Sequence, residues 1–364
     1  MKNSEDMVKR SVNRRSFLRN GVLAGGAAVA GAGLLSSGKT MLAQENDDAR
    51  GSLDRGDVAI LRFVAAAEII ESDLWQQYAE LGGITSDSST NPYQAAFQVL
   101  DSDGLQYITS NTNDEISHAT FLNAYLESKG EEPVNLDEFR TLQGSQATGA
   151  QNIGRLTNLM HLTVDTSWYI RYRSTTNPDF GATYPQALTI TNRTSIPITD
   201  ADFDNQMHIQ AIANTAAFHF GTVEQAGSSL YASLGQKVTH AEVLEITLGI
   251  GADEVAHFLE WVDFAGNAVS GPPVTDNGLT FPNFNDPPNP LLQTNLIFPV
   301  PCEFIHPKLP HCAVIRPITD KFGGAVAAAN GLVGMNLFMG QPKKFFNTLM
   351  RMAREADAAR RGQI

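Results

Sequence analysis

The sequence predicts an all-α protein whose main part is an antiparallel four-helix bundle. Four long segments carry apolar residues at helical spacing, and a mixed segment divides them into two pairs. The turn between the third and fourth helices is only a few residues long, which makes neighbouring helices antiparallel. With 42% hydrophobic and 18% charged residues, the 364-residue chain can bury a sizeable core.

The first pair of helices begins after a polar segment. Asp57 can cap the first helix, which ends at Gly82 and Gly83. The polar stretch TSDSSTNP follows and is expected to be a loop. The second helix has the sequence GLQYITSNTNDEISHATFLNAYLESKG and ends at Gly130.

The second pair of helices follows an insertion. Residues 131–198 show no sustained helical period, and we interpret them as an insertion between helices 2 and 3. Thr199 or Asp200 is the expected cap of the third helix, and the fourth helix is HAEVLEITLGIGADEVAHFLEWVDFAG. The bundle is therefore predicted to span residues 57–267.

Residues 268–364 form a predicted C-terminal extension. Its first part is rich in proline, which rules out long helices there. The apolar, glycine-broken run GGAVAAANGLVGMNLFMG is expected to pack against the bundle. An amphipathic helix, PKKFFNTLMRMAREADAARRG, is expected to close the chain.

Residues 1–43 resemble a twin-arginine signal peptide. Arg14 and Arg15 precede a weakly apolar run rich in Ala and Gly, although Asn13 stands where such signals usually have Ser or Thr. The run is too short and too glycine-rich for a stable membrane anchor. The resemblance implies that the twin-arginine machinery exports the folded protein to the periplasm or another extracytoplasmic space. Residues 44–56 are expected to be a linker.

The cysteine count and the net charge restrict the kind of protein. Cys302 and Cys312 are the two cysteines, too few for a Cys-rich zinc or iron–sulfur framework. They are candidates for a disulfide, because the expected destination is oxidising. A net charge of −13 disfavours duplex nucleic acid as a partner.

One short motif occurs twice. The sequence is DEISH at residues 114–118 and DEVAH at residues 253–257. Glu115 and His118 are three residues apart, as are Glu254 and His257, so each pair lies on one helix face. Both motifs lie in apolar helices, where a charged Glu is costly unless it is paired or bound to metal.

The other two helices each supply a matching carboxylate. Glu71 is followed seven residues later by Tyr78, and Glu224 is followed seven residues later by Tyr231. Seven residues are two helical turns, so each Tyr lies on the face of its own Glu. Glu68, one turn before Glu71, is an alternative. The two tyrosines could support the site or could pack in the core with a satisfied hydroxyl.

Together these residues form the ligand set of a carboxylate di-metal site. Such a site takes one Glu from each of two helices and Glu-x-x-His from each of the other two. Four carboxylates neutralise two divalent cations, and iron is expected ahead of manganese, although zinc would also bind. The predicted ligands are Glu71, Glu115, His118, Glu224, Glu254 and His257.

The stretches AAEIIESDLW, DEISHATFLNAYL, TVEQAGSSLY and ADEVAHFLEW resemble the ferritin-like superfamily. The closest resemblance is to exported ferritin-like domain proteins, which include desiccation-related members. The His on the fourth helix makes the site similar to those of rubrerythrin, bacterioferritin and manganese catalase. The resemblance implies the same six ligands. It also implies that Asp114 and Asp253 each hold the His of the opposite motif.

Two kinds of function are compatible with this resemblance. The first is redox chemistry on peroxide, dioxygen or ferrous iron, of the peroxidase, catalase or ferroxidase type. The alternative is a non-enzymatic stress or desiccation-related envelope protein with a structural or lost metal site. The resemblance implies no built-in electron-transfer domain, since rubredoxin-type cysteine pairs are missing from this sequence. The substrate and a possible homo-oligomer stay open.

Overall fold

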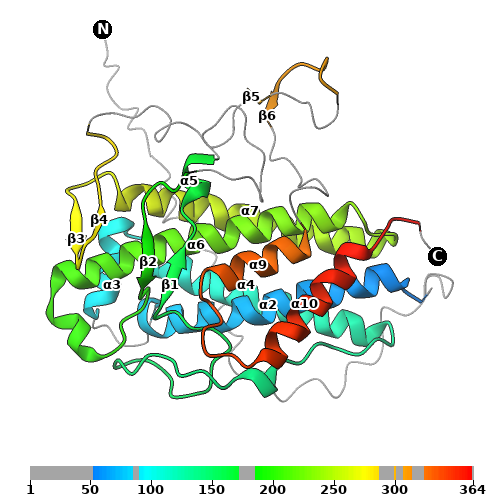
Figure 1. Cartoon of the computed structure of the whole chain (residues 1–364), viewed down its shortest axis with the longest axis horizontal. Coiled ribbons are helices and arrows are strands. Elements are labelled where there is room, and N and C mark those ends of the chain that lie inside the picture. The colour runs from blue at the N-terminus through cyan, green and yellow to red at the C-terminus, as the bar shows by residue number, and fades with distance from the viewer. Residues whose placement is uncertain are drawn as a thin grey trace, which may run out of the picture. The chain divides into compact units, whose positions relative to one another are not determined.

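The computed structural model describes residues 52–84, 90–171, 185–286, 299–300, 306–313 and 324–362. Four long helices form the bundle and confirm the predicted all-α fold (Figure 1). They are α2 (Arg55–Gly82), α4 (Gly104–Ser128), α6 (Gln206–Gly235) and α7 (Ala241–Ala268). Each buries an apolar stripe against its neighbours, which supplies most of the driving force for folding.

The bundle consists of two closely packed helix pairs, α2 with α4 and α6 with α7, whereas α4 and α7 contact each other much less. Side-chain hydrogen bonds define the direction of the first pair. The Ser72 hydroxyl donates to the carbonyl of Glu115, and the Thr112 hydroxyl donates to the carbonyl of Trp75. Residue numbers rise along α2 as they fall along α4, so the two helices are antiparallel, as predicted.

The start of α2 differs from the prediction. Asp54 caps the helix and accepts a hydrogen bond from the Asp57 amide at 2.8 Å. The Asp57 carboxylate instead accepts from the amides of Thr239 and His240, each at 2.8 Å, just before α7 begins. Two aspartates three residues apart could both cap a helix, and tertiary contacts decide between them. The predicted signal and the linker residues before position 52 lie outside the described residues.

A short helix, α3 (Pro92–Leu100), begins at the last residue of the predicted loop TSDSSTNP and was not predicted. Asn91 is its N-cap, and the Asn91 and Gln94 side chains form a reciprocal capping box. Pro92 occupies the first helical turn, where its missing amide hydrogen costs nothing. The pair Asn-Pro therefore starts a helix here, although it usually indicates a turn.

The insertion between α4 and α6 contains η2 (Asp137–Phe139), β1 (Leu162–Val164), α5 (Ser167–Arg171) and β2 (Ile190–Arg193). Strands β1 and β2 pair antiparallel. The buried carboxylate of Asp73 on α2 accepts from the amides of Leu156 and Thr157 at 3.0 and 2.9 Å. Arg140 also donates to Asp73, at 2.7 Å. Asp73 thus fastens the insertion to the bundle.

The third bundle helix begins later than predicted. Thr199 caps a separate 3₁₀ helix, η3 (Asp200–Asp204), through a capping box with Asp202. The cap of α6 is Asn205, whose side chain accepts from the amides of Met207 and His208 at 3.0 and 3.2 Å. These are the second and third residues of the helix, whose amides an N-cap side chain normally satisfies. The expected caps Thr199 and Asp200 therefore belong to the preceding element.

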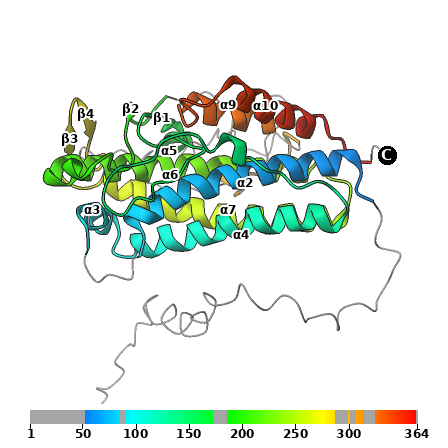
Figure 2. The same cartoon turned by 90° about the horizontal axis from the view of Figure 1, so that it is seen from below.

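The C-terminal extension contains the strand pairs β3 (Val274–Asp276) with β4 (Leu279–Phe281) and β5 (Pro299–Val300) with β6 (Cys312–Ala313). Helices α9 (Ala325–Gly334) and α10 (Lys343–Ala358) follow, and α10 agrees with the predicted final helix. Helix α10 packs against α2, and α9 packs against α10 and α6. Figure 2 shows α9 and α10 on the side of α2 and α6, with α4 and α7 on the opposite side.

The predicted disulfide cannot be placed, because Cys302 lies outside the described residues, while Cys312 is exposed. Across the described ranges, none of the helices combines the length and the apolar character that a membrane crossing requires.

Candidate metal centre

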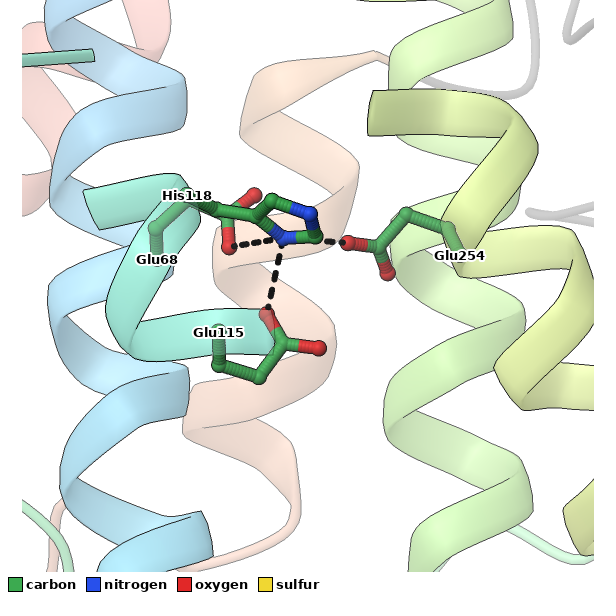
Figure 3. Close-up of side chains that lie close together, drawn as sticks. All are labelled: Glu68, Glu115, His118 and Glu254. Carbon is green, nitrogen blue, oxygen red and sulfur yellow. Dashed lines mark ion pairs between the residues drawn. The ribbon is translucent and has the colours of Figure 1, made fainter. Parts of the chain in front are cut away.

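The two repeated motifs meet in the middle of the bundle. The His118 ring on α4 points toward carboxylates from three helices (Figure 3). Its Nδ1 atom lies 3.4 Å from Glu68 Oε2, 3.4 Å from Glu115 Oε2 and 3.8 Å from Glu254 Oε1. All four side chains are buried, so together they form a compact group of one nitrogen and three oxygen ligands.

A second group of the same composition adjoins the first. The Nδ1 atom of His257 on α7 lies 3.2 Å from Glu115 Oε1 and 3.3 Å from Glu224 Oε2. Glu254 completes this group, and its members are also buried. Glu115 and Glu254 belong to both groups, whereas each group has its own His and its own further Glu. The arrangement is that of two neighbouring cation sites joined by two shared carboxylates.

The polar atoms of the two groups lack the hydrogen bonds that burial normally demands. Among the described residues, fourteen buried side-chain nitrogen and oxygen atoms have no hydrogen-bond partner, and seven of them belong to these groups. They include Nδ1 of both histidines and both oxygens of Glu254. Buried polar atoms are usually paired, so such a concentration fits a centre that binds cations.

The pKa shifts show an excess of negative charge. Burial raises the pKa of the Glu115 carboxyl to about 8, with further contributions from Glu68 and Glu224. The pKa of Glu254 is raised as well, by burial and then by the neighbouring carboxylates. Burial by itself would lower the pKa of His118, but the nearby carboxylates of Asp253, Glu115 and Glu68 raise it to about 12. The centre therefore favours added positive charge, either protons or metal cations.

Glu68 is the α2 residue in these groups, whereas the sequence analysis preferred Glu71 and kept Glu68 as the alternative. The two halves of the bundle match when Glu68 is aligned with Glu224. Seven residues later the matching aromatic residues are Trp75 and Tyr231. The Tyr231 hydroxyl donates to Glu68, and Trp75 Nε1 donates to Glu224 Oε1 at 3.0 Å. Each aromatic residue thus supports the carboxylate of the opposite helix.

The hydrogen bonds of Tyr78 go to residues outside the two groups, as in the core-packing alternative of the sequence analysis. Its hydroxyl is 2.7 Å from Ser195 Oγ and 2.7 Å from His219 Nδ1, and neither partner belongs to the two groups. Its ring packs edge-on against Phe220. The match of Tyr78 with Tyr231 suggested the wrong register, because the residue equivalent to Tyr231 is a tryptophan, Trp75.

Glu71 and Gly227 occupy corresponding positions in the two halves and break their symmetry. A Cβ atom at Gly227 would lie 2.1 Å from Glu254 Oε2, so only glycine leaves room for that shared carboxylate. Glu71 is buried, and its Oε2 atom has no hydrogen-bond partner. Burial raises its pKa, and Glu115 is the neighbour that adds most. Glu71 is therefore an additional carboxylate on one side of the centre.

We expect Glu71→Ala to discriminate between the two candidate ligands on α2. Because Glu68 lies in the carboxylate–histidine group and Glu71 does not, the Glu71 variant should retain two metal ions per chain. Glu68→Ala, the matched variant one turn away, should lose one ion. Mass spectrometry of the desalted proteins measures the ratio, and the opposite pattern would identify Glu71 as the ligand.

Asn111 is a supporting residue that the sequence analysis missed. Its side-chain amide donates to Glu115 Oε1 at 3.0 Å and to Glu224 Oε1 at 3.3 Å. Its Oδ1 atom accepts from Trp261 Nε1 at 2.7 Å. Asn111 precedes Glu115 by four residues, which places both on one helix face and could have revealed it.

The aspartates of the repeated motifs each contact the His of the other motif and lie near one another on one side of the centre. Asp253 Oδ2 is 3.2 Å from His118 Nε2, and Asp114 Oδ2 is 3.4 Å from His257 Nε2. This is the cross-helix arrangement that the resemblance implied. Both aspartates are partly exposed, so each links a buried imidazole to the solvent side of α4 and α7. Such contacts fix the ring orientation and the tautomer of a metal-binding His.

We expect Asp253→Ala to weaken metal binding by roughly 10–100-fold without unfolding the bundle, because His118 loses the acceptor that orients it. Competition with a metallochromic chelator measures the affinity, and thermal melting reports the fold. Asp263→Ala is the matched control, since Asp263 is exposed on the same helix. Equal affinities for the two variants would show that the contact with His118 has no role in metal binding.

Residues 56–261 match the family model described as a ferritin-like domain. This match spans more than half of the chain and covers nearly all of the four bundle helices, apart from the end of α7 and the first residue of α2. No curated protein and no solved structure matches the chain.

Proposed function

The chain belongs to the ferritin-like domain family, and from this premise we propose that it is an exported di-metal oxidoreductase that reduces peroxide. The observation that carries the proposal is the pair of buried groups that share Glu115 and Glu254. A centre built to hold two adjacent cations suits two-electron chemistry, because each ion can contribute one electron.

The residues present fit two divalent ions. Glu68 and His118 would hold one ion, Glu224 and His257 would hold the other, and Glu115 and Glu254 would bridge them. The four carboxylates neutralise two divalent cations, and the mixture of hard oxygen and imidazole ligands suits iron, with manganese as the second choice. Bound in this way, the two ions would supply the electrons that reduce the substrate.

The surrounding side chains would control water and protons. The rings of Trp75, Phe220 and Trp261 pack on one another beside the carboxylates, with centroids 4.5 to 5.3 Å apart, and exclude water from that side. On the other side, Asp253 joins the buried His118 to solvent. Reduction of peroxide to water consumes two protons, which would come from this solvent side, where Asp253 and its counterpart Asp114 lie.

The experiment measures metal content and turnover on protein recovered from outside the cytoplasm. We expect about two metal ions per chain by mass spectrometry, mainly iron, and peroxide consumption in the presence of a reductant. A variant with Arg14→Lys and Arg15→Lys should stay in the cytoplasm if the twin-arginine pathway exports the chain.

The possible outcomes separate the parts of this proposal. Two bound ions without peroxide consumption would favour the structural, non-enzymatic alternative. A chain isolated without metal, and unable to bind it when refolded with ferrous iron, would refute the di-metal centre. Normal export of the double-lysine variant would refute the export route alone.

A further inference from the structure

An open groove lies between α4 and α7, beside the metal centre. Its volume is about 890 Å³, and His118 and Asp253 form part of its lining. Helices α4 and α7 contact each other much less than the closely packed pairs α2–α4 and α6–α7 do, which leaves room for the groove between them. A molecule bound at the His118 end of the groove would touch a side chain that faces the buried carboxylates.

The groove is far larger than peroxide requires. A water molecule occupies roughly 30 Å³ of liquid, and peroxide is not much larger. Pockets of roughly 300–1,000 Å³ are typical for organic ligands. The groove therefore has room for an organic molecule in addition to the substrate of the metal centre.

The walls of the groove favour a flat apolar molecule. Phe121 and Tyr125 on α4 lie nearly parallel, with ring centroids 6.4 Å apart and an interplanar angle of 21°. Phe121 is 50% exposed, so part of its ring surface is accessible from the groove. Ile246 and Ile250 line the groove from α7, and Gly249 between them has no atom within 4 Å of where a Cβ would lie. An aromatic ring could pack against these surfaces.

The charges around the groove disfavour an anion. Lys129 lines the groove, but its Nζ atom lies 2.5 Å from Glu242 and is neutralised by it. Glu245 and Asp253 add further carboxylates to the lining. Carboxylates can accept hydrogen bonds from hydroxyl groups, so a neutral molecule with hydroxyl groups fits this environment better than an acid.

We propose that this groove binds a neutral aromatic reductant of the hydroquinone class, which donates electrons to the metal centre. The inference rests on the proposed peroxide reduction, which needs two electrons from outside the chain. The hydroquinone breaks two O–H bonds and becomes a quinone, releasing two electrons and two protons. Peroxide takes them up as its O–O bond breaks, and two water molecules form. The reductant would transfer its electrons through the His118 side of the centre.

The test uses 1,4-naphthohydroquinone and its negatively charged 2-sulfonate as probes under anaerobic conditions. Calorimetry on the purified protein should detect the neutral probe and find the sulfonate bound about tenfold more weakly or worse. Gly249→Leu fills the groove and should weaken binding of the neutral probe at least about tenfold, because the added side chain takes the space of the ring. Gly334→Leu is the matched control, since Gly334 is also helical, with no atom within 4 Å of a Cβ position.

Turnover separates this inference from the proposed function. Peroxide reduction is driven either by naphthohydroquinone or by hexaammineruthenium(II), an outer-sphere donor that needs no groove. Gly249→Leu should raise the KM for naphthohydroquinone by a factor at least about tenfold larger than the factor by which it raises the KM for hexaammineruthenium(II). If Gly249→Leu raises both KM values equally, or leaves probe binding undiminished, the groove assignment is wrong. Turnover driven by hexaammineruthenium(II) would still support the proposed function.

Two further outcomes count against the inference. If neither donor drives turnover, the proposed function fails and the reductant role fails with it. If sedimentation shows that the unmodified protein is a dimer and Gly249→Leu a monomer, the groove is an interface between copies of the chain.

Discussion

Replacing Glu115 by Ala is expected to abolish binding of both metal ions. Glu115 Oε2 lies 3.4 Å from His118 Nδ1, and Oε1 lies 3.2 Å from His257 Nδ1, so this one residue serves both groups. Glu224→Ala removes a carboxylate from one group only and should leave about one ion per chain. The metal-to-protein ratio after desalting, measured by mass spectrometry, distinguishes the two results.

The stability of the metal-free variant provides the control for this experiment. Glu115 is a buried carboxyl whose pKa is raised by burial and by its neighbours, so it destabilises the metal-free bundle near neutral pH. Metal-free Glu115→Ala should therefore be no less stable than the metal-free unmodified chain, apart from a small cavity cost. If metal-free Glu115→Ala were unfolded, the loss of metal would result from unfolding and not from the missing ligand. Equal stoichiometry in Glu115→Ala and Glu224→Ala would refute the bridging role.

The sequence was sufficient for the helices and for most of the centre, because both are encoded locally. Helical periodicity defines the four long helices, and the three-residue spacing of Glu and His places each pair on one face. The contact of Asp253 with His118 follows once the two motifs are known to face each other. These features depend on helix geometry, which is the same in every protein.

Features that depend on the packing of one helix against another could not be predicted in the same way. Glu68 and Glu71 are one turn apart on the same face, and only the register of α2 against α6 selects Glu68. The alignment of Trp75 with Tyr231 would have indicated that register, since Ser72 and Ser228 also match in it. The groove beside His118 depends on the spacing between α4 and α7, for which the sequence contains no local signal.

Removing the metal is expected to destabilise the protein most at high pH. In the metal-free fold the pKa of Glu115 is about 8 against an ordinary 4.5, so the folded state binds more protons than the unfolded state between these values. His118, with a pKa raised from 6.5 to about 12, adds stability that is fully present below 6.5 and is lost as the pH rises toward 12. Both shifts make the metal-free protein less stable as the pH rises.

Metal binding has the opposite dependence, because a cation must displace the same protons from its ligands. The free energies of unfolding of the metal-loaded and chelator-treated proteins should therefore diverge between about pH 5 and about pH 8, by up to about 1.4 kcal/mol per pH unit for each proton displaced, and their melting temperatures should diverge with them. Differential scanning calorimetry across this range measures the gap. Glu115→Gln should reduce the slope of the metal-free curve, since it removes one of the titrating groups. Parallel curves for the metal-loaded and metal-free proteins would mean that the buried carboxylates and imidazoles do not bind the metal.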